Sequence, residues 1–185
     1  MKFLDTLLQK SNYHVDDNWH EDFIVHLAQL LKPEVYVELG IYRASLFNKM
    51  IPIAKECYAV DYDPGCKQYI TSSPNAHFYQ MTTREFTYIL KDLPMIDILF
   101  IDADHDPASV INDFYNHIGH VKDNGLVFIH DTYPRDVEMT GPEYCGNAFK
   151  AIGPIRSCPG VELMTIPLHP GLTVVRKCRK QVPWE

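Results

Sequence analysis

The sequence lacks several features that mark other classes of protein. Its five cysteines, Cys57, Cys66, Cys145, Cys158 and Cys178, are scattered and odd in number and form no C-x-x-C pair, so neither a disulfide framework nor a zinc site is indicated. No apolar run approaches the roughly 20 residues of a membrane span, and Asp5 and Gln9 interrupt the apolar start that a signal peptide would need. We therefore expect a soluble, cytoplasmic protein with reduced thiols and no membrane partner.

An excess of positive charge is also missing. The formal net charge is −7 over 185 residues, and no block of like charge occurs. Proteins that bind nucleic acids usually carry a basic face, so we expect no nucleic-acid partner. The hydrophobic fraction of 46% is typical of a folded domain with its own core.

From Val35 on, short apolar runs alternate with amphipathic segments. Strands are expected at Val35–Leu39, Cys57–Asp61, His77–Gln80, Ile96–Asp102 and Leu126–His130, and helices at Ala44–Ile53, Gly65–Thr71, Thr83–Leu90, Pro107–His120 and near Asn147–Ile152. This alternation predicts an α/β fold with a doubly wound, mostly parallel sheet. The last two runs, Val161–Ile166 and Leu172–Arg176, are separated by too few residues for a crossover helix, so the last strand is expected to be antiparallel.

Residues 1–33 have a helical apolar pattern that Pro33 ends. We expect them to form an N-terminal helical segment, which serves either as a lid over the site or as the surface of a homodimer. Residues 34–185 then form the main domain.

Glu38 and Gly40 stand where the first expected strand gives way to a helix. The glycine lets a ligand approach the backbone, the helix offers free N–H groups, and Glu38 can hold a positive charge. Asp61 ends the next apolar run, 21 residues past Gly40, which is the spacing of an acid that binds ribose. The alternative to a ligand site is an ordinary strand end whose Glu38 is solvated. The pairing of this turn with Asp61 favours a site for a nucleoside cofactor instead.

A second polar cluster follows the fourth expected strand. Asp106, before Pro107, is best explained as a helix cap, whereas Asp102, Asp104 and His105 are candidates for binding a metal or substrate or for acting as a general base. His130 and Asp131 end the fifth strand and should lie beside this cluster, because consecutive elements in such sheets stay close.

Four motifs together resemble the class I S-adenosylmethionine-dependent methyltransferases. They are V-E-L-G-x-x-x-A-S at 37–45, V-D-Y-D at 60–63, F-I-D-A-D-H at 100–105 and G-L-V-F-I-H-D-T at 125–132. More narrowly, the chain resembles the group with D-x-D-H after the fourth strand and H-D after the fifth. The resemblance implies a Rossmann-like methyltransferase fold. It departs at Ala44, where the family usually has a further glycine.

The resemblance also implies roles for the matching residues. The cofactor-binding positions would be Glu38, Gly40 and Ser45 at the amino-acid end of the cofactor, Asp61 at its ribose, Tyr62 beside its adenine, Thr82 or Thr83 in the adenine pocket, and Asp102. Thr82 is equally well explained as a helix cap, since Glu85 follows three residues later.

Two arrangements could remove the proton of a methyl acceptor. Asp102 and Asp131 could hold a divalent cation such as Mg²⁺, although Thr132 is a weaker donor than the third oxygen ligand of metal-dependent relatives. Without a metal, the catalytic residues would be His105 or His130, as neutral imidazoles, together with Asp104. The other histidines, His117 among them, are expected at the surface or as caps, and only His20, beside Trp19 in the N-terminal segment, is left open, because such a segment often forms a lid.

The function expected from the sequence is methyl transfer from S-adenosylmethionine to a small molecule, most simply to oxygen. The loop Tyr133–Cys145 is expected to carry substrate selectivity. A nicotinamide-dependent dehydrogenase is disfavoured because the turn lacks the paired glycines of G-x-G-x-x-G. A cofactor-binding protein without catalysis is the other alternative.

Overall fold

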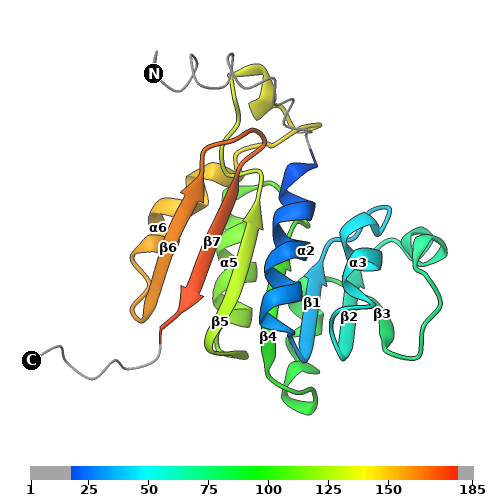
Figure 1. The fold of residues 1–185 in the computed structure, drawn as a ribbon. Helices are drawn as coiled ribbons and strands as arrows, with labels where there is room; N and C mark the ends of the chain where they lie inside the picture. The colour runs from blue at the N-terminus through cyan, green and yellow to red at the C-terminus, as the bar shows by residue number, and fades with distance from the viewer. Residues whose placement is uncertain (1–17, 179–185) are drawn as a thin grey trace, which may run out of the picture.

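A seven-stranded sheet lies between two layers of helices in the computed structural model, which describes residues 18–178 (Figure 1). The strands are β1 (Val35–Leu39), β2 (Glu56–Asp61), β3 (Ala76–Gln80), β4 (Ile96–Ile101), β5 (Val121–His130), β6 (Val161–Ile166) and β7 (Leu172–Lys177). Their order in the sheet is β3-β2-β1-β4-β5-β7-β6, and β7 runs antiparallel to both of its neighbours, β5 and β6. This arrangement confirms the predicted doubly wound fold and its antiparallel last strand.

Helices cover both faces of the sheet (Figure 1). The α-helices are α2 (Trp19–Leu31), α3 (Ser45–Met50), α4 (Thr83–Phe86), α5 (Pro107–Ile118) and α6 (Ile152–Arg156), and short 3₁₀ helices are η1 (Pro64–Tyr69), η2 (Leu90–Asp92), η3 (Glu138–Thr140) and η4 (Ala148–Ala151). Among residues 18–178, no helix combines the length and apolar character required to cross a membrane.

The alternating residues of β1 divide the core into two clusters. Tyr36 packs with Ile24 of α2 and Phe47 of α3 on one face, whereas Val37 packs in the cluster that contains Phe114 of α5 on the other. All five residues of β1 are buried, as expected for a central parallel strand covered on both faces. The described part of the N-terminal segment, α2, therefore contributes to the core. Its role as a lid or dimer surface stays a prediction.

Several boundaries differ from those expected. The expected helix Gly65–Thr71 is the 3₁₀ helix η1, which starts at Pro64, and the helix expected over Thr83–Leu90 is interrupted between α4 and η2. Asn124 and Gly125 lie within β5 instead of preceding it, and Asn124 has a φ of 64° at an irregularity of the strand. The Asn-Gly pair, which commonly forms a turn before a strand, here forms an irregularity within the strand.

The strand order reverses between β1 and β4, so the carboxyl ends of these two strands form the position where open α/β sheets bind ligands. Gly40 follows β1 with a φ of +80°, and a Cβ added there would lie 2.3 Å from the backbone oxygen of Asp102. Ala44 has a φ of 55°, so the position that departs from the family keeps a glycine-like backbone. The turn thus packs directly on the residue that follows β4.

Replacement of Gly40 by alanine is expected to destabilise the protein by roughly 2–4 kcal/mol, because the methyl group meets backbone and the φ is left-handed. Urea unfolding measures the change. Gly119→Ala is the matched control, since a Cβ at Gly119 meets nothing within 4 Å and its φ is −60°. Equal stability of the two variants would contradict the close contact between Gly40 and Asp102.

Candidate active site

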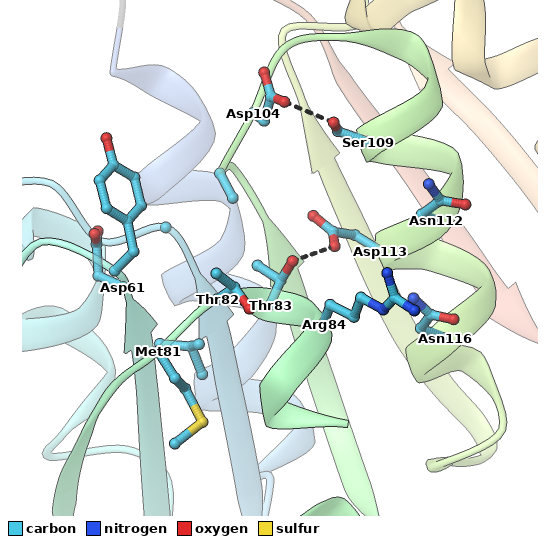
Figure 2. Close-up of a pocket in the computed structure, with 14 residues that line it drawn as sticks. Asp61, Met81, Thr82, Thr83, Arg84, Asp104, Ser109, Asn112, Asp113 and Asn116 are labelled. Atoms are coloured by element: carbon cyan, nitrogen blue, oxygen red, sulfur yellow. Dashed lines mark hydrogen bonds between the residues drawn. The ribbon is translucent and has the colours of Figure 1, made fainter. Parts of the chain in front are cut away.

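A cavity of about 900 Å³ opens at the carboxyl edge of the sheet (Figure 2). It is lined from the ends of β1, β2, β3 and β4 and from α4 and α5, by Gly40, Val60, Asp61, Tyr62, Met81, Thr82, Thr83, Arg84, Ala103, Asp104, Ser109, Asn112, Asp113 and Asn116. Of the predicted site residues, the cavity brings together Gly40, Asp61, Tyr62, Thr82 and Asp104. The helices α4 and α5 add polar groups that the sequence analysis did not single out.

Asp61 organises the turn that follows β1. Its Oδ2 accepts a hydrogen bond from the backbone N–H of Ile41 at 3.0 Å, and its Oδ1 accepts one from the N–H of Asp63 at 2.9 Å. A carboxylate fixed in this way keeps lone pairs for a ligand at the cavity wall. Tyr62, next along the chain, is 78% exposed at the same wall.

Thr82 is a helix cap, as one of the two explanations from the sequence predicted, and its role in cofactor binding stays a prediction. Its hydroxyl accepts a hydrogen bond from the N–H of Glu85, and the Glu85 carboxylate accepts one from the N–H of Thr82, which is a capping box at the start of α4. Thr82 also lines the cavity.

Glu38 is buried beneath this edge and is 3% exposed. Burial raises the pKa of Glu38 well above its usual value, the hydrogen bond from the Tyr36 hydroxyl opposes the shift, and the nearby charges of Asp102 and Glu21 add to it. A carboxyl group surrounded by other acids favours a cationic ligand group.

Ser45 forms a hydrogen bond with helix α2 and does not line the cavity. Its hydroxyl donates to Glu21 of α2 at 2.7 Å, and Lys49 lies 3.0 Å from the same carboxylate. Glu21 was not foreseen, since α2 lies far from the other site residues in the sequence.

Asp102, His105, His130 and Asp131 form the predicted second cluster. His105 Nε2 lies 3.0 Å from Asp131 Oδ2 and 3.7 Å from Asp102 Oδ1. His130 Nδ1 lies 3.1 Å from Asp102 Oδ1 and 3.3 Å from Asp131 Oδ2. Two strand ends and the loop after β4 therefore direct two imidazoles at one pair of carboxylates.

Asp102 and Asp131 change the protonation of both histidines. They raise the pKa of His105 to about 9. Burial works against protonation of His130, yet the same carboxylates raise its pKa to about 10. Burial would by itself raise the pKa of Asp102, but His130 and His105 hold it well below its usual value. These shifts favour the protonated form of both imidazoles, which argues against the neutral rings expected from the sequence.

Other elements fix the orientation of these rings. His105 Nδ1 donates to the backbone oxygen of Tyr144, in the loop after β5, and a Cβ added at Gly146 would lie 2.6 Å from His105 Cβ. His20 of α2 packs on His130 with ring centroids 4.0 Å apart. The sequence pattern raised His20 only as an uncertain residue, because its helix is distant in the chain.

Asp104 lies apart from this cluster. Its carboxylate accepts hydrogen bonds from the Ser109 hydroxyl at 2.6 Å and from the N–H of Asp106 at 3.2 Å (Figure 2). Asp106 caps α5 through the N–H of Ala108, as predicted. Asp104 therefore belongs to the cavity wall near α5.

The donor set of the cluster fits a divalent cation. One ligand atom from each of Asp102, His105 and Asp131 lies within 4.8 Å of the others. Thr132 is 4% exposed and its hydroxyl accepts a hydrogen bond from Thr173 at 3.0 Å, so it is engaged elsewhere. The third donor of such a site would be the imidazole of His105, whose Nδ1 bond to the backbone oxygen of Tyr144 is a contact common to metal-binding histidines.

Asp113 is a buried carboxyl group on α5 that lines the cavity and is 5% exposed. Burial raises its pKa from 3.8 to about 6, although the hydrogen bond from Thr83 lowers it. His117, one turn further, is fully buried, which contradicts the expected surface position, and burial lowers its pKa to about 4.

Asp113→Asn is expected to stabilise the protein at pH 7.5 by up to about 3 kcal/mol relative to the wild type, with the gain vanishing near pH 3.8. Between pH 3.8 and about 6 the unfolded chain releases the proton of Asp113 while the folded protein keeps it, so wild-type stability falls as pH rises. Urea unfolding of both proteins at pH 4 and 7.5 measures this difference. A gain that does not depend on pH would contradict the assigned shift.

Comparison with known proteins places this geometry in a family. A family model for a methyltransferase domain matches residues 22–132, more than half of the chain. An uncharacterized protein of Acanthamoeba polyphaga mimivirus is 29% identical over 146 residues, which are 66% of this chain and 66% of that protein. The chain thus spans just under two thirds of the length of this curated relative.

Two solved structures share the fold. An O-methyltransferase from Bacillus cereus, in complex with SAH, is 10% identical and has a TM-score of 0.73, with 95% of this chain and 88% of that chain covered. The O-methyltransferase TomG from Streptomyces achromogenes, in complex with SAM, is 12% identical and has a TM-score of 0.73, with 86% and 80% covered. At such identities these likenesses establish the fold alone. By the family model, which runs from within α2 to just past the end of β5, the chain belongs to the methyltransferase domain family.

Proposed function

We propose that the protein is an S-adenosylmethionine-dependent methyltransferase that acts on an oxygen atom of a small molecule, and that it belongs to the group with D-x-D-H and H-D motifs. One observation carries the proposal. The turn at Gly40 packs on the backbone of Asp102, so the candidate cofactor cavity and the Asp102–His105–His130–Asp131 cluster lie against each other at one sheet edge.

The residues at the cavity fit this cofactor. Asp61 can accept hydrogen bonds from the two ribose hydroxyls, Gly40 leaves room for close approach, and Tyr62 is free to cover the base. Glu38 supplies a buried acid for the cationic amino-acid end. Bound there, S-adenosylmethionine supplies a methyl group on a positively charged sulfur.

In the transfer, the chain aligns the acceptor oxygen with the methyl group and manages one proton. The Asp102–His105–His130–Asp131 cluster beside the cavity is the part of the site suited to handling the proton that the acceptor loses. Asp102 and Asp131 hold the imidazoles of His105 and His130 in place, and the loop that carries Tyr144 covers His105. The loop Tyr133–Cys145 contacts His105 through Tyr144 and therefore lies beside this cluster, which supports its assignment to substrate selectivity.

We also propose a divalent cation at this cluster, held by Asp102 and Asp131 with His105 as the third donor. Such a cation lowers the pKa of an acceptor hydroxyl. A set of two carboxylates and an imidazole suits Mn²⁺ or Co²⁺ better than Mg²⁺, which prefers oxygen ligands.

The competing functions account for less of the site. A nicotinamide-dependent dehydrogenase needs clearance for a pyrophosphate, yet the turn carries Ala44 with its side chain fully buried. A binding protein without catalysis has no use for four converging ionisable side chains. The net charge of −7 supports a small-molecule acceptor over RNA, in a soluble cytoplasmic enzyme.

The test uses S-adenosylmethionine with a tritiated methyl group, a panel of phenols, catechols and aliphatic alcohols, total RNA as a separate arm, and added Mn²⁺. We expect label in an organic-soluble hydroxyl product and equimolar S-adenosylhomocysteine. His105→Gln should reduce the rate at least roughly 100-fold, while the control His77→Gln, at a half-buried histidine outside the cluster and the cavity, should leave it unchanged. Label only in RNA would overturn the small-molecule assignment, and no turnover with tight cofactor binding would favour the non-catalytic reading.

A further inference from the structure

We propose that His20 is a positioning residue for the Asp102–His105–His130–Asp131 cluster, because its ring holds the imidazole of His130 in the orientation that the cluster needs. This inference rests on the proposed function and assigns a role to a residue that stands outside the four sequence motifs.

His20 is a polar residue on the buried face of α2. It is 6% exposed and lies one turn before Ile24, which is fully buried. A histidine in such a position needs specific contacts to offset the loss of its hydration. Its ring packs on His130 of β5, with centroids 4.0 Å apart and an angle of 43° between the planes. The buried histidine of α2 therefore lies directly on an imidazole of the cluster.

A third ring completes this packing. Phe100 of β4, two residues before Asp102, stacks on His20 with a centroid distance of 6.2 Å and contacts His130 at 5.9 Å. Phe100 is itself buried. His130 is thus enclosed by two rings that come from different elements, α2 and β4.

The hydrogen bonds of His130 do not fix its ring plane by themselves. Its Nδ1 lies 3.1 Å from Asp102 and 3.3 Å from Asp131, whereas its Nε2 is buried and has no hydrogen-bond partner among residues 18–178. A ring bonded through one nitrogen can still turn, because the second side-chain torsion of histidine is broad. Packing by His20 and Phe100 supplies the remaining constraint.

Contacts on either side of His20 keep its own ring in place. Trp19 Nε1 donates a hydrogen bond at 2.9 Å to the backbone oxygen of His169, in the loop between β6 and β7. On the other side, the Glu21 carboxylate accepts a hydrogen bond at 2.7 Å from Ser45, at the start of α3. The first turn of α2 is therefore fixed at two points, and His20 between them forms a rigid support.

This support gives the two imidazoles of the cluster different roles. The side chain of His105 is 31% exposed, against 12% for His130. His105 is therefore the imidazole that a ligand can reach, and His130, covered by His20, holds the carboxylates of Asp102 and Asp131 in place for it. A reacting group whose support is loosened loses rate more than it loses binding.

A simpler explanation is that His20 only stabilises the packing of α2. In that case, another substitution that destabilises α2 should change the activity in the same way, and the ring of His130 should not respond specifically to His20. Ile24→Ala provides the matched control, because Ile24 is fully buried on the same helix.

The experiment compares His20→Ala, His20→Phe and Ile24→Ala in the full chain with Mn²⁺ present, using the acceptor that gives turnover in the panel above. It measures kcat, the KM for S-adenosylmethionine, urea unfolding and the ring resonances of His130 by NMR, which His130→Gln assigns. His20→Ala should lower kcat roughly 10-fold or more, change KM by no more than about 2-fold, and shift or broaden the His130 signal.

The other two variants separate positioning from stability. His20→Phe keeps a planar ring and should restore kcat to within about 3-fold of the wild type. Ile24→Ala should lose at least as much stability as His20→Ala and yet keep the kcat and the His130 signal of the wild type. If His20→Ala fails to fold, His20→Leu, which keeps apolar bulk without a planar ring, takes its place with the same expected loss.

An unchanged kcat or an unchanged His130 signal in folded His20→Ala would overturn the inference and leave the proposed function intact. A loss of kcat in His20→Phe or in Ile24→Ala as large as that in His20→Ala would do the same. Absence of methyl transfer by the wild type would instead overturn the proposed function, and the NMR comparison alone would then decide whether His20 orients His130.

Discussion

Asp61→Ala is expected to lower the affinity for S-adenosylhomocysteine at least about 100-fold. The variant loses two charge-assisted hydrogen bonds to the ribose. It also loses the acceptor for the N–H groups of Ile41 and Asp63, so the turn after Gly40 is no longer held for the ligand. Isothermal titration calorimetry at pH 7.5 measures the change, and circular dichroism checks that the variant folds.

The matched control is Asp63→Asn. Asp63 stands two residues away, accepts a hydrogen bond from the N–H of Gly65 at the start of η1, and does not line the cavity. Its replacement should change the affinity by no more than about 3-fold. If both variants lose affinity equally, the contribution of Asp61 is structural and the ribose assignment is wrong.

Asp131→Asn is the second variant with a large expected effect. Asp131 is 6% exposed, and its Oδ2 lies within 3.3 Å of both imidazoles. An amide cannot replace the anionic donor, so we expect Mn²⁺ to bind at least roughly 50-fold more weakly and methyl transfer to fall in parallel. Electron paramagnetic resonance of free Mn²⁺ measures the affinity independently of activity.

Asp136→Asn serves as the control for this variant. Asp136 is an exposed carboxylate in the loop after β5, where it pairs with Arg135 at 3.2 Å. Its replacement should leave Mn²⁺ affinity and turnover unchanged. Equal Mn²⁺ affinity in Asp131→Asn and the wild type would exclude Asp131 as a ligand and contradict the proposed cation site.

The strands were predictable because central parallel strands are buried on both faces and read as continuous apolar runs. The run at Val35–Leu39 matches β1 to the residue, and all its side chains are buried. Short helices gave a weaker signal. The apolar pattern after Thr83 extends through Leu90, yet α4 ends at Phe86 because the chain turns through a 3₁₀ segment. Few hydrogen bonds stabilise helices this short, so tertiary contacts set their ends.

The site residues that the sequence identified stand at the ends of strands, and the order of the strands in the sheet determines which of these residues lie side by side. Gly40, Asp61, Asp102 and Asp131 follow from the strand positions alone. His20 and Glu21 could not be found in this way, because they reach the site from α2 across a long stretch of sequence.

The sequence position of Asp113 could have identified it as a candidate site residue. It lies between Val110 and Phe114 on the apolar face of α5, where a carboxyl group needs a specific reason to be buried. The same face holds the buried His117.

Calorimetric titration of the wild-type chain with S-adenosylhomocysteine and, separately, with NAD tests the central claim most directly. We expect micromolar binding of S-adenosylhomocysteine and no measurable heat with NAD, because the site offers Asp61 and Glu38 to a nucleoside with a cationic amino-acid end and no glycine-rich cradle for a pyrophosphate. Binding of NAD without binding of S-adenosylhomocysteine would contradict the account.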